Sequence, residues 1–155
     1  MYYTVRYAHL KRSFKNIGES ITRGELIGTM GSTGQSNVNH LHIDCVIGER
    51  NYLYHLSDIG YEKNFPLTPS IKQLNYFIDS ELFGVRPLVT TFYYDPEYKI
   101  LYNKDHPGYD LVPINRHETQ DNFDIHWNRS ARGEVLTTGY DPTGYGNYIQ
   151  IGFEG

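Results

Sequence analysis

The chain has 155 residues, the size of a single domain with its own hydrophobic core. Its formal net charge of −4 excludes the broad basic surface of a nucleic-acid-binding protein. The 15 tyrosines, 15 glycines and 7 prolines favour short strands joined by many turns. No apolar run is long enough to span a membrane, and the N-terminus lacks the pattern of a signal peptide. We therefore expect one domain over residues 1–155, with no nucleic-acid partner and no membrane insertion.

The N-terminal segment is predicted to contain a strand and a hairpin. Residues 2–7 are rich in side chains that favour β-structure. His9 follows, so we place it at the end of this strand, where it either projects into a cleft or is an ordinary exposed histidine. Residues 11–16 are predicted as a polar loop. Residues 17–28 alternate apolar side chains with turn glycines, which predicts a tight hairpin followed by a short strand. A loop rich in Gly, Ser and Asn occupies residues 31–37.

A second strand is predicted at residues 39–47, where polar and apolar residues alternate. This alternation places His40, His42 and Asp44 on one face. The other face packs into the core and carries Leu41, Ile43, Cys45 and Ile47. The two imidazoles are about 6–7 Å apart, because each residue of a strand advances about 3.3 Å. One of them can bind a metal while the other serves as acid or base, or both are surface histidines on an edge strand.

The middle of the chain contains the one substantial helix that we predict, near residues 70–83. Its apolar side chains recur at helical spacing, Thr68 or Ser70 provides the N-cap, and Gly84 ends it. Residues 49–66 are predicted to be irregular. Residues 88–94 and 97–102 are each predicted to form a short strand.

A second histidine motif, His-Pro-Gly-Tyr-Asp, runs from His106 to Asp110. The Pro-Gly turn breaks any helix, so helical spacing does not bring the two residues together. A loop that leads into a strand at residues 110–112 can instead point both at one centre, and imidazole and carboxylate are good zinc ligands. We interpret His117 and His126 as non-ligands. The chain then ends in a strand, a turn and a final strand, at residues 133–139, 140–146 and 147–153.

Three motifs combine into a family pattern: Tyr7-Ala8-His9-Leu10, His40-Leu41-His42 and His106-Pro107-Gly108-Tyr109-Asp110. With the glycine-bearing segments around them, the chain resembles the LytM/lysostaphin-type zinc metallopeptidases that cut peptidoglycan peptides. The resemblance implies a mainly β fold, an antiparallel sheet or sandwich. It covers residues 1–48 and 104–155, which would form the peptidase core. Residues 49–103 would be a connecting segment that contains the predicted helix.

The order of the motifs differs from that of the family, in which the His-x-x-x-Asp segment comes first and His-Leu-His comes last. Here the final strand, residues 147–153, would run through a hairpin turn into residues 2–7. The two halves written end to end read as one family sequence. The resemblance thus implies a circular permutant opened at that hairpin. A swapped dimer, in which half-domains pair between chains, is the alternative.

The resemblance implies a role for each site residue. The zinc ligands would be His42, His106 and Asp110, which leaves a fourth position for water. His9 and His40 would flank the metal as catalytic residues. One would act as general base towards the water, and the other would stabilise the developing oxyanion or protonate the leaving amine. Asp44 either accepts a hydrogen bond from an imidazole or is solvated, and we expect it to be solvated.

By this resemblance the chain is a zinc-dependent endopeptidase that hydrolyses peptide cross-links of bacterial peptidoglycan. It would act on the cell wall outside the cell, or from a virion as part of a larger assembly such as a phage tail. The alternative is a non-catalytic wall-binding or structural virion module in which zinc only stabilises the fold. A fourth protein ligand or a plugged groove would favour that alternative.

Overall fold

The computed structural model describes residues 2–36, 38–47, 78–92, 94–106, 108–116 and 122–154. Within these ranges the chain forms nine strands and two short helices. Their bounds in chain order are β1 Tyr2–Ser13, β2 Ser20–Ile21, β3 Leu26–Met30, β4 Leu41–Ile47, α3 Ser80–Phe83, β5 Pro87–Thr91, α4 Pro96–Tyr102, β6 Tyr109–Pro113, β7 Asp124–His126, β8 Gly133–Asp141 and β9 Gly146–Glu154.

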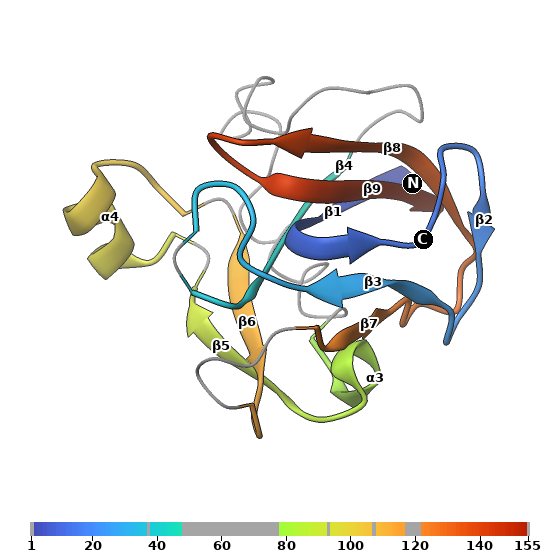
Figure 1. Ribbon diagram of the computed structural model, residues 1–155, viewed down its shortest axis with the longest axis horizontal. Coiled ribbons are helices and arrows are strands. Elements are labelled where there is room, and N and C mark those ends of the chain that lie inside the picture. The colour runs from blue at the N-terminus through green and yellow to red at the C-terminus, as the bar shows by residue number, and fades with distance from the viewer. Residues whose placement is uncertain are drawn as a thin grey trace.

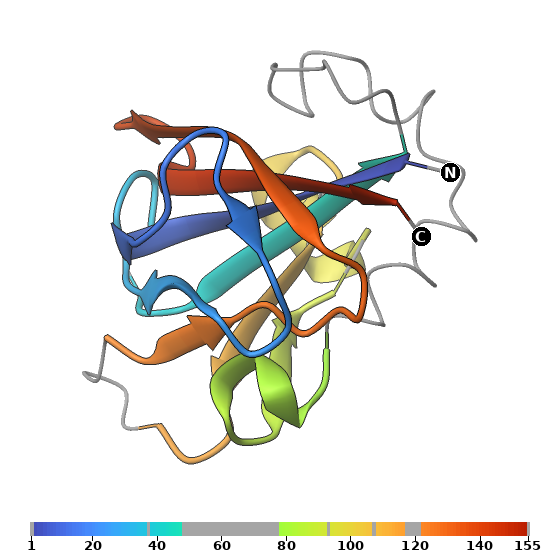
Figure 2. The ribbon, with the colours of Figure 1, turned by 90° about the vertical axis from the view of Figure 1, so that its right-hand side faces the viewer.

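The strands form one antiparallel sheet in the order β2-β8-β9-β1-β4-β6-β5, and β3 branches off to pair with both β1 and β7 (Figure 1). The predicted mainly β, antiparallel class is therefore confirmed. Strands β1 and β9 lie side by side, with Tyr2 opposite Glu154. The two ends of the described chain are consequently neighbours, as Figure 2 also shows.

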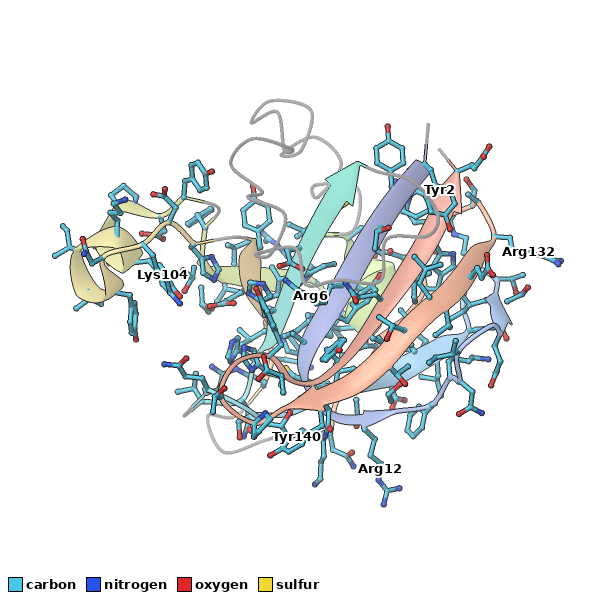
Figure 3. All side chains as sticks on the ribbon, turned by 90° about the horizontal axis from the view of Figure 1, so that it is seen from above. Tyr2, Arg6, Arg12, Lys104, Arg132 and Tyr140 are labelled. Carbon is cyan, nitrogen blue, oxygen red and sulfur yellow. The ribbon has the colours of Figure 1, made fainter. Side chains whose placement is uncertain are left out.

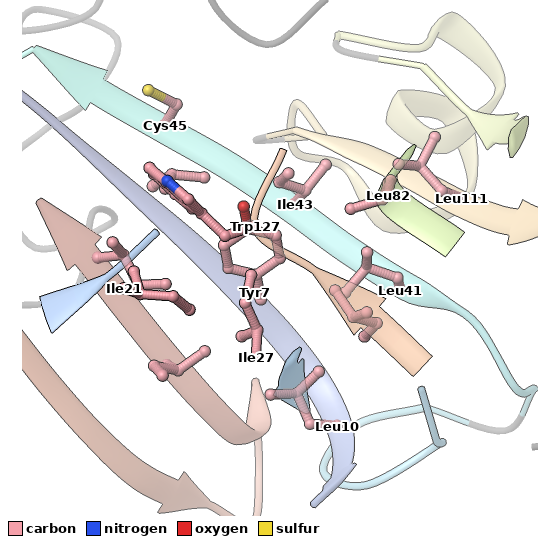
Figure 4. Close-up of a cluster of buried hydrophobic side chains, with 14 of the residues drawn as sticks. Tyr7, Leu10, Ile21, Ile27, Leu41, Ile43, Cys45, Leu82, Leu111 and Trp127 are labelled. Atoms are coloured by element: carbon pink, nitrogen blue, oxygen red, sulfur yellow. The ribbon is translucent and has the colours of Figure 1, made fainter. Parts of the chain in front are cut away.

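The central strands bury side chains on both faces of the sheet. On one face Tyr7 and Ile43 point into the hydrophobic core, together with side chains from β3 and the segment after β7 (Figure 4). Trp127 closes this core by packing on the ring of Phe153 in β9, with the ring centroids 5.4 Å apart. The opposite face carries buried polar residues instead, among them Arg6, His42 and Asp44. Period-two alternation thus separates a packing face from a polar face.

Strand β1 is longer than predicted. It continues through residues 11–13, which we had assigned to a polar loop, because this part pairs with β3 from Leu10 opposite Met30 to Ser13 opposite Gly28. The prediction that His9 ends the strand is therefore wrong. The predicted hairpin at residues 17–28 is also corrected, because β2 pairs with β8 and β3 pairs with β1 and β7.

Helix α3 occupies only the end of the helix predicted near residues 70–83. It begins at Ser80 because Asp79 is extended and its side chain accepts a hydrogen bond from the Glu81 amide. It ends as expected at Gly84, which has a φ of 77°. The proposed N-caps Thr68 and Ser70 lie outside the described residues, as do residues 49–66 and 70–77.

Helix α4 corrects two predictions. Residues 97–102 are helical where we predicted a strand, and the segment at 49–103 therefore contains a second helix. Asp95 provides the N-cap by accepting a 3.0 Å hydrogen bond from the Glu97 amide, and Pro96 lies in the first turn. None of its residues is buried, and it projects from the sheet (Figure 1). Neither described helix has the length or the apolar character to cross a membrane.

Candidate metal centre

The centre of the site is a cross-strand pair. His42 of β4 stands directly opposite Asp110 of β6, and its Nδ1 atom lies 3.0 Å from Asp110 Oδ1. Directly opposite side chains in antiparallel strands have Cβ atoms about 4.5–5.5 Å apart, so the register alone brings these two into contact. Strand pairing thus joins the His-Leu-His motif to the His-x-x-x-Asp motif.

His106 reaches this pair from the loop before β6. Its Nε2 lies 3.3 Å from Asp110 Oδ1, and its Nδ1 lies 3.1 Å from the carbonyl oxygen of Phe92. A carbonyl only accepts hydrogen bonds, so Nδ1 carries a proton, and Nε2 faces the carboxylate. The loop crosses β4 closely at Gly108, where a Cβ atom would lie 2.1 Å from the carbonyl oxygen of Ile43. The absence of a side chain at Gly108 therefore lets His106 approach the centre.

The donor atoms of His42, His106 and Asp110 all lie within 4.8 Å of one another. Two of the separations, 3.0 and 3.3 Å, are close to the value of about 3.3 Å expected between ligands of tetrahedral zinc. Both histidines are buried, and their remaining ring nitrogens contact the side chain of Asp44 and the backbone of Phe92. Such outer contacts orient the imidazoles of metal sites. The donor set therefore fits a zinc ion.

His9 approaches the cluster from a distorted position inside β1. Its φ of 60° is in the left-handed region, which is uncommon for a residue other than glycine. Two contacts hold it there: its amide donates to the Tyr145 carbonyl oxygen at 2.7 Å, and its Nδ1 lies 2.7 Å from the Thr33 carbonyl oxygen. Because that carbonyl can only accept, Nδ1 is protonated and Nε2 keeps its lone pair.

His40 lies just before β4, where its amide donates to the carbonyl oxygen of Gly31 at 3.1 Å. Its Nδ1 is 3.0 Å from the Val38 carbonyl oxygen, and its Nε2 is 3.6 Å from Asp110 Oδ1. The ring centroids of His40 and His9 are 4.9 Å apart. His9 and His40 thus stand together beside the candidate ligands.

Asp44 is fully buried, which corrects the expectation that it is solvated. Arg6 stands opposite it in the β1–β4 ladder and donates from Nε to Oδ1 at 3.0 Å and from Nη2 to Oδ2 at 2.8 Å. Asp44 Oδ2 also lies 3.2 Å from His42 Nε2. Figure 3 shows Arg6 among the side chains on this face of the sheet. A charged partner and a hydrogen bond together make burial of this carboxylate tolerable.

The pKa values reflect these contacts. Burial by itself lowers the pKa of His42, but the carboxylates of Asp44 and Asp110 outweigh burial and raise it to about 9. Burial raises the pKa of Asp44, but Arg6 and His42 outweigh it and lower the value to about 2. For Asp110, hydrogen bonds from His106 and His42 overcome burial and hold the pKa far below its usual range. Asp110 is therefore ionised and can attract a cation, whereas the charge of Asp44 is balanced by Arg6.

The pKa values of His9 and His40 are lowered, in contrast to that of His42. Burial, followed by the neighbouring His42 and His40, lowers the pKa of His9 to about 4. Burial also lowers the pKa of His40, although Asp110 opposes the shift. Both imidazoles are consequently neutral at pH 7, with the proton on Nδ1 and a lone pair on Nε2.

A hollow of about 1050 Å³ opens over the cluster. Tyr145, from the turn between β8 and β9, lines one side of it, and residues of α4 line another. The ring of Tyr98 in α4 lies 4.6 Å from the ring of His106 and 4.6 Å from that of Tyr102, measured between centroids. A hollow of this size accommodates a ligand as large as a short peptide.

The structure gathers at this hollow every site residue expected from sequence, namely His9, His40, His42, His106 and Asp110. The sequence interpretation missed Arg6, Tyr98 and Tyr145. Arg6 does carry a signal, because a charged residue within a run of β-forming residues needs a partner. Tyr98 carried none, since its segment was assigned to a strand.

Of the two histidines interpreted as non-ligands, His126 lies apart from the cluster. His126 lies in β7, with its Nδ1 atom 3.4 Å from the carbonyl oxygen of Leu82. It does not belong to the candidate metal group among the described residues. His117 lies outside the described residues.

Comparison with known proteins connects this geometry to a family. Residues 1–52 match the model of Peptidase family M23, and this segment includes β1 to β4 with His9, His40 and His42. The resemblance to zinc metallopeptidases is therefore confirmed for that segment. His106 and Asp110 lie beyond the matched residues.

A curated relative matches part of the chain. Over 45 residues, the chain is 38% identical to the peptidoglycan DD-endopeptidase ShyC of Vibrio cholerae serotype O1 (strain ATCC 39315 / El Tor Inaba N16961), covering 29% of this chain and 10% of the relative. The match thus spans about a tenth of the relative's length. No solved structure matches the chain.

Proposed function

We propose that this chain is a zinc-dependent endopeptidase that hydrolyses peptide cross-links of bacterial peptidoglycan. The observation that carries the proposal is the cluster of His42, His106 and Asp110 at the base of an open hollow, with His9 and His40 beside it. The M23 match over residues 1–52 and the similarity to a peptidoglycan DD-endopeptidase support the same reaction and the cell wall as the place of action.

His42, His106 and Asp110 would hold the zinc through Nδ1, Nε2 and a carboxylate oxygen. When bound, zinc lowers the pKa of a coordinated water and polarises a carbonyl group. The protein's contribution is to fix the three donors before the metal arrives. The strand register places His42 against Asp110, and the Phe92 carbonyl sets the tautomer of His106.

His9 and His40 would carry out the proton transfers of the reaction. Each is neutral at pH 7 with an unprotonated Nε2, which is the state required of a general base. One would take a proton from the attacking water, and the other would act on the carbonyl oxygen or the leaving amine. The contacts of Nδ1 with Thr33 and Val38 keep both rings in this orientation.

A zinc-stabilised binding module without activity is the second function class. The candidate ligand group among the described residues has three members, and the hollow above it is lined by both proposed catalytic histidines. Three ligands with room beside them are typical of a catalytic zinc rather than a structural one. These features support the peptidase over the binding module.

We also propose that the chain is a circular permutant of the peptidase fold in which residues 1–48 and 104–155 form one core. Two observations support this arrangement. The C-terminal strand β9 pairs with the N-terminal strand β1, and β4 pairs with β6 within one chain. A hairpin between β9 and β1 is therefore the natural place for the opening. The expected association with a phage tail or larger virion assembly stays a prediction, because neither comparison bears on it.

The experiment that tests the function measures metal and hydrolysis on the same preparations. We expect about one zinc per chain by elemental analysis, and release of peptide-linked fragments from purified peptidoglycan by mass spectrometry. His9→Ala and His40→Ala should keep the zinc and lose hydrolysis. His126→Ala is the matched control, because it removes a histidine remote from the hollow.

The outcomes separate the two function classes. Zinc with no cleavage of several wall types would favour the binding module. Absence of zinc from the wild-type chain after incubation with zinc would overturn the metal site and the peptidase together. Full hydrolysis by both histidine variants would overturn their catalytic roles alone.

A further inference from the structure

Arg6 occupies a position that hydrophobic packing does not account for. Its side chain is fully buried in the centre of the sheet. On one side it contacts Asp44 through two hydrogen bonds, and on the other its guanidinium lies 3.5 Å from the centre of the Tyr145 ring. A planar guanidinium held between a carboxylate and an aromatic face has little freedom to rotate.

The contacts continue from Arg6 to the candidate metal centre. Arg6 Nη2 donates to Asp44 Oδ2 at 2.8 Å, and the same oxygen lies 3.2 Å from His42 Nε2. On the opposite side of that ring, His42 Nδ1 faces Asp110 at 3.0 Å. The guanidinium, a carboxylate and the imidazole therefore form one chain of contacts that ends at a donor atom of the centre.

We propose that Arg6 is a positioning residue of the metal centre, which fixes the Asp44 carboxylate so that Asp44 in turn holds the His42 ring with Nδ1 towards the metal. The inference rests on the proposed zinc site, and it assigns a role to two residues outside the candidate ligand group. A carboxylate bound at both oxygens cannot rotate, so it presents Oδ2 to His42 at a fixed angle.

Stability alone explains this arrangement poorly. Desolvation of a buried ion pair offsets most of its attraction, and apolar residues of similar volume often stabilise a protein equally well. A positioning role makes a different demand, because it requires the two-pronged geometry that arginine has and lysine lacks. The two explanations therefore differ in what they predict for metal affinity.

The test is zinc affinity measured by competition with a chelating dye on the full chain. Asp44→Asn leaves a side chain of the same size without the charge, and Arg6→Lys keeps a positive charge without the fork. We expect each variant to bind zinc about 10- to 100-fold more weakly, the usual loss when an outer partner of a metal-bound histidine is removed. Glu134→Gln, a partly exposed carboxylate of β8, is the control and should bind as the wild type does.

A double-mutant cycle distinguishes action through Asp44 from a separate effect. If Arg6 acts through Asp44, Arg6→Lys should cost little further affinity in the Asp44→Asn background, so that the two losses do not add. Cobalt provides a second readout, because its visible absorption reports the geometry of the ligands. We expect the cobalt spectra of both single variants to differ from that of the wild type.

Circular dichroism and thermal melting before metal addition show whether each variant folds. Folded variants with wild-type zinc affinity and cobalt spectra would overturn the inference and leave a purely structural ion pair. Additive losses in the double variant would overturn the path through Asp44. If one single variant fails to fold, the other is used for the test. If neither folds, the Arg6–Asp44 pair is needed for folding itself, and the inference is overturned. Wild-type zinc binding without hydrolysis would contradict the proposed peptidase function while leaving this test intact.

Discussion

His42 and Asp110 are separated by 68 residues in the sequence, yet they face each other across two paired strands with Nδ1 and Oδ1 3.0 Å apart. The candidate metal centre is therefore created by pairing of two strands, β4 and β6, that are far apart in the sequence. Metal binding and pairing of β4 with β6 should consequently stabilise each other.

Removing the carboxylate at this pair should abolish tight metal binding. Asp110→Asn replaces an ionised ligand with a neutral amide, so we expect zinc affinity to fall by more than the roughly 10- to 100-fold that loss of an outer partner costs. Chelator competition measures the loss, and the melting temperature without zinc checks the fold. His126→Ala should bind zinc normally. Unchanged affinity in Asp110→Asn would exclude this carboxylate as a ligand.

The stability of the zinc-free protein should fall as the pH rises from 6.5. The pKa of His42 is raised from 6.5 to about 9, so its contribution is complete below pH 6.5 and is lost as the pH rises through 9. The pKa of Asp44 is lowered to about 2, so its contribution to stability depends on pH in the opposite sense and is lost only in acid. Buried Cys45 adds a loss only above the ordinary thiol value of 9.0.

Thermal melting in chelator between about pH 7.5 and 9 reports mainly on His42, because the lowered pKa values of His9 and His40 change stability with the opposite sign and chiefly below their ordinary value of 6.5. Zinc affinity should rise across the same range, because the metal needs the deprotonated ring. His42→Asn should flatten the pH dependence of the melting temperature and weaken zinc binding at every pH, whereas His126→Ala should retain both dependences. A melting temperature that rises with pH in the wild-type chain would contradict the raised pKa.

A methyl group at Gly108 should displace the loop that carries the candidate ligand His106. Its Cβ would lie 2.1 Å from the backbone oxygen of Ile43, which cannot move aside as a side chain can. We expect Gly108→Ala to destabilise the fold by about 1–3 kcal/mol and to weaken zinc binding. Gly139→Ala is the control, since its Cβ would meet only the flexible end of the Tyr148 side chain. Equal zinc affinity in the two variants would show that the close approach at Gly108 does not position His106.

The aromatic side of the hollow should contribute to substrate binding rather than to chemistry. Tyr102 of α4 lines the hollow and contacts Tyr98 but touches none of the proposed ligands in the described structure. We expect Tyr102→Ala to raise KM about 3- to 10-fold with kcat little changed, the pattern of lost uniform binding. Ile100→Ala removes an exposed side chain of the same helix that does not line the hollow. A change in kcat alone would contradict a binding role for this helix.

One chain should be sufficient to make the site. We expect His42→Ala and Asp110→Ala to remain inactive after they are mixed, unfolded and refolded together. In a swapped dimer the two variants would complement each other, and about a quarter of the sites would be intact. Recovery of hydrolysis in the mixture, with a dimeric mass by sedimentation, would support domain swapping instead.

The sequence was informative wherever the structure depends on local alternation or on a strong motif. The strand that contains His42 was predicted from its period of two, although it begins at Leu41 rather than residue 39, and its apolar face does enter the core at Ile43. The helix at residues 96–102 was missed although Asp95 and Pro96 are typical of a helix start. The β-forming side chains of Tyr98, Ile100 and Tyr102 led to the opposite assignment, because local propensity is a weak guide when a helix is short and exposed.

By itself, the sequence determined the mainly β class and the faces of the central strands, and its resemblance to a family singled out the five residues that the structure places around one hollow. Only the tertiary structure decided the left-handed conformation of His9 and the burial of Asp44 beside Arg6. The physical reason is that alternation and motifs depend on residues close in the chain. Burial, tautomers and pKa values depend instead on partners from other strands, which the chain brings together only when it folds.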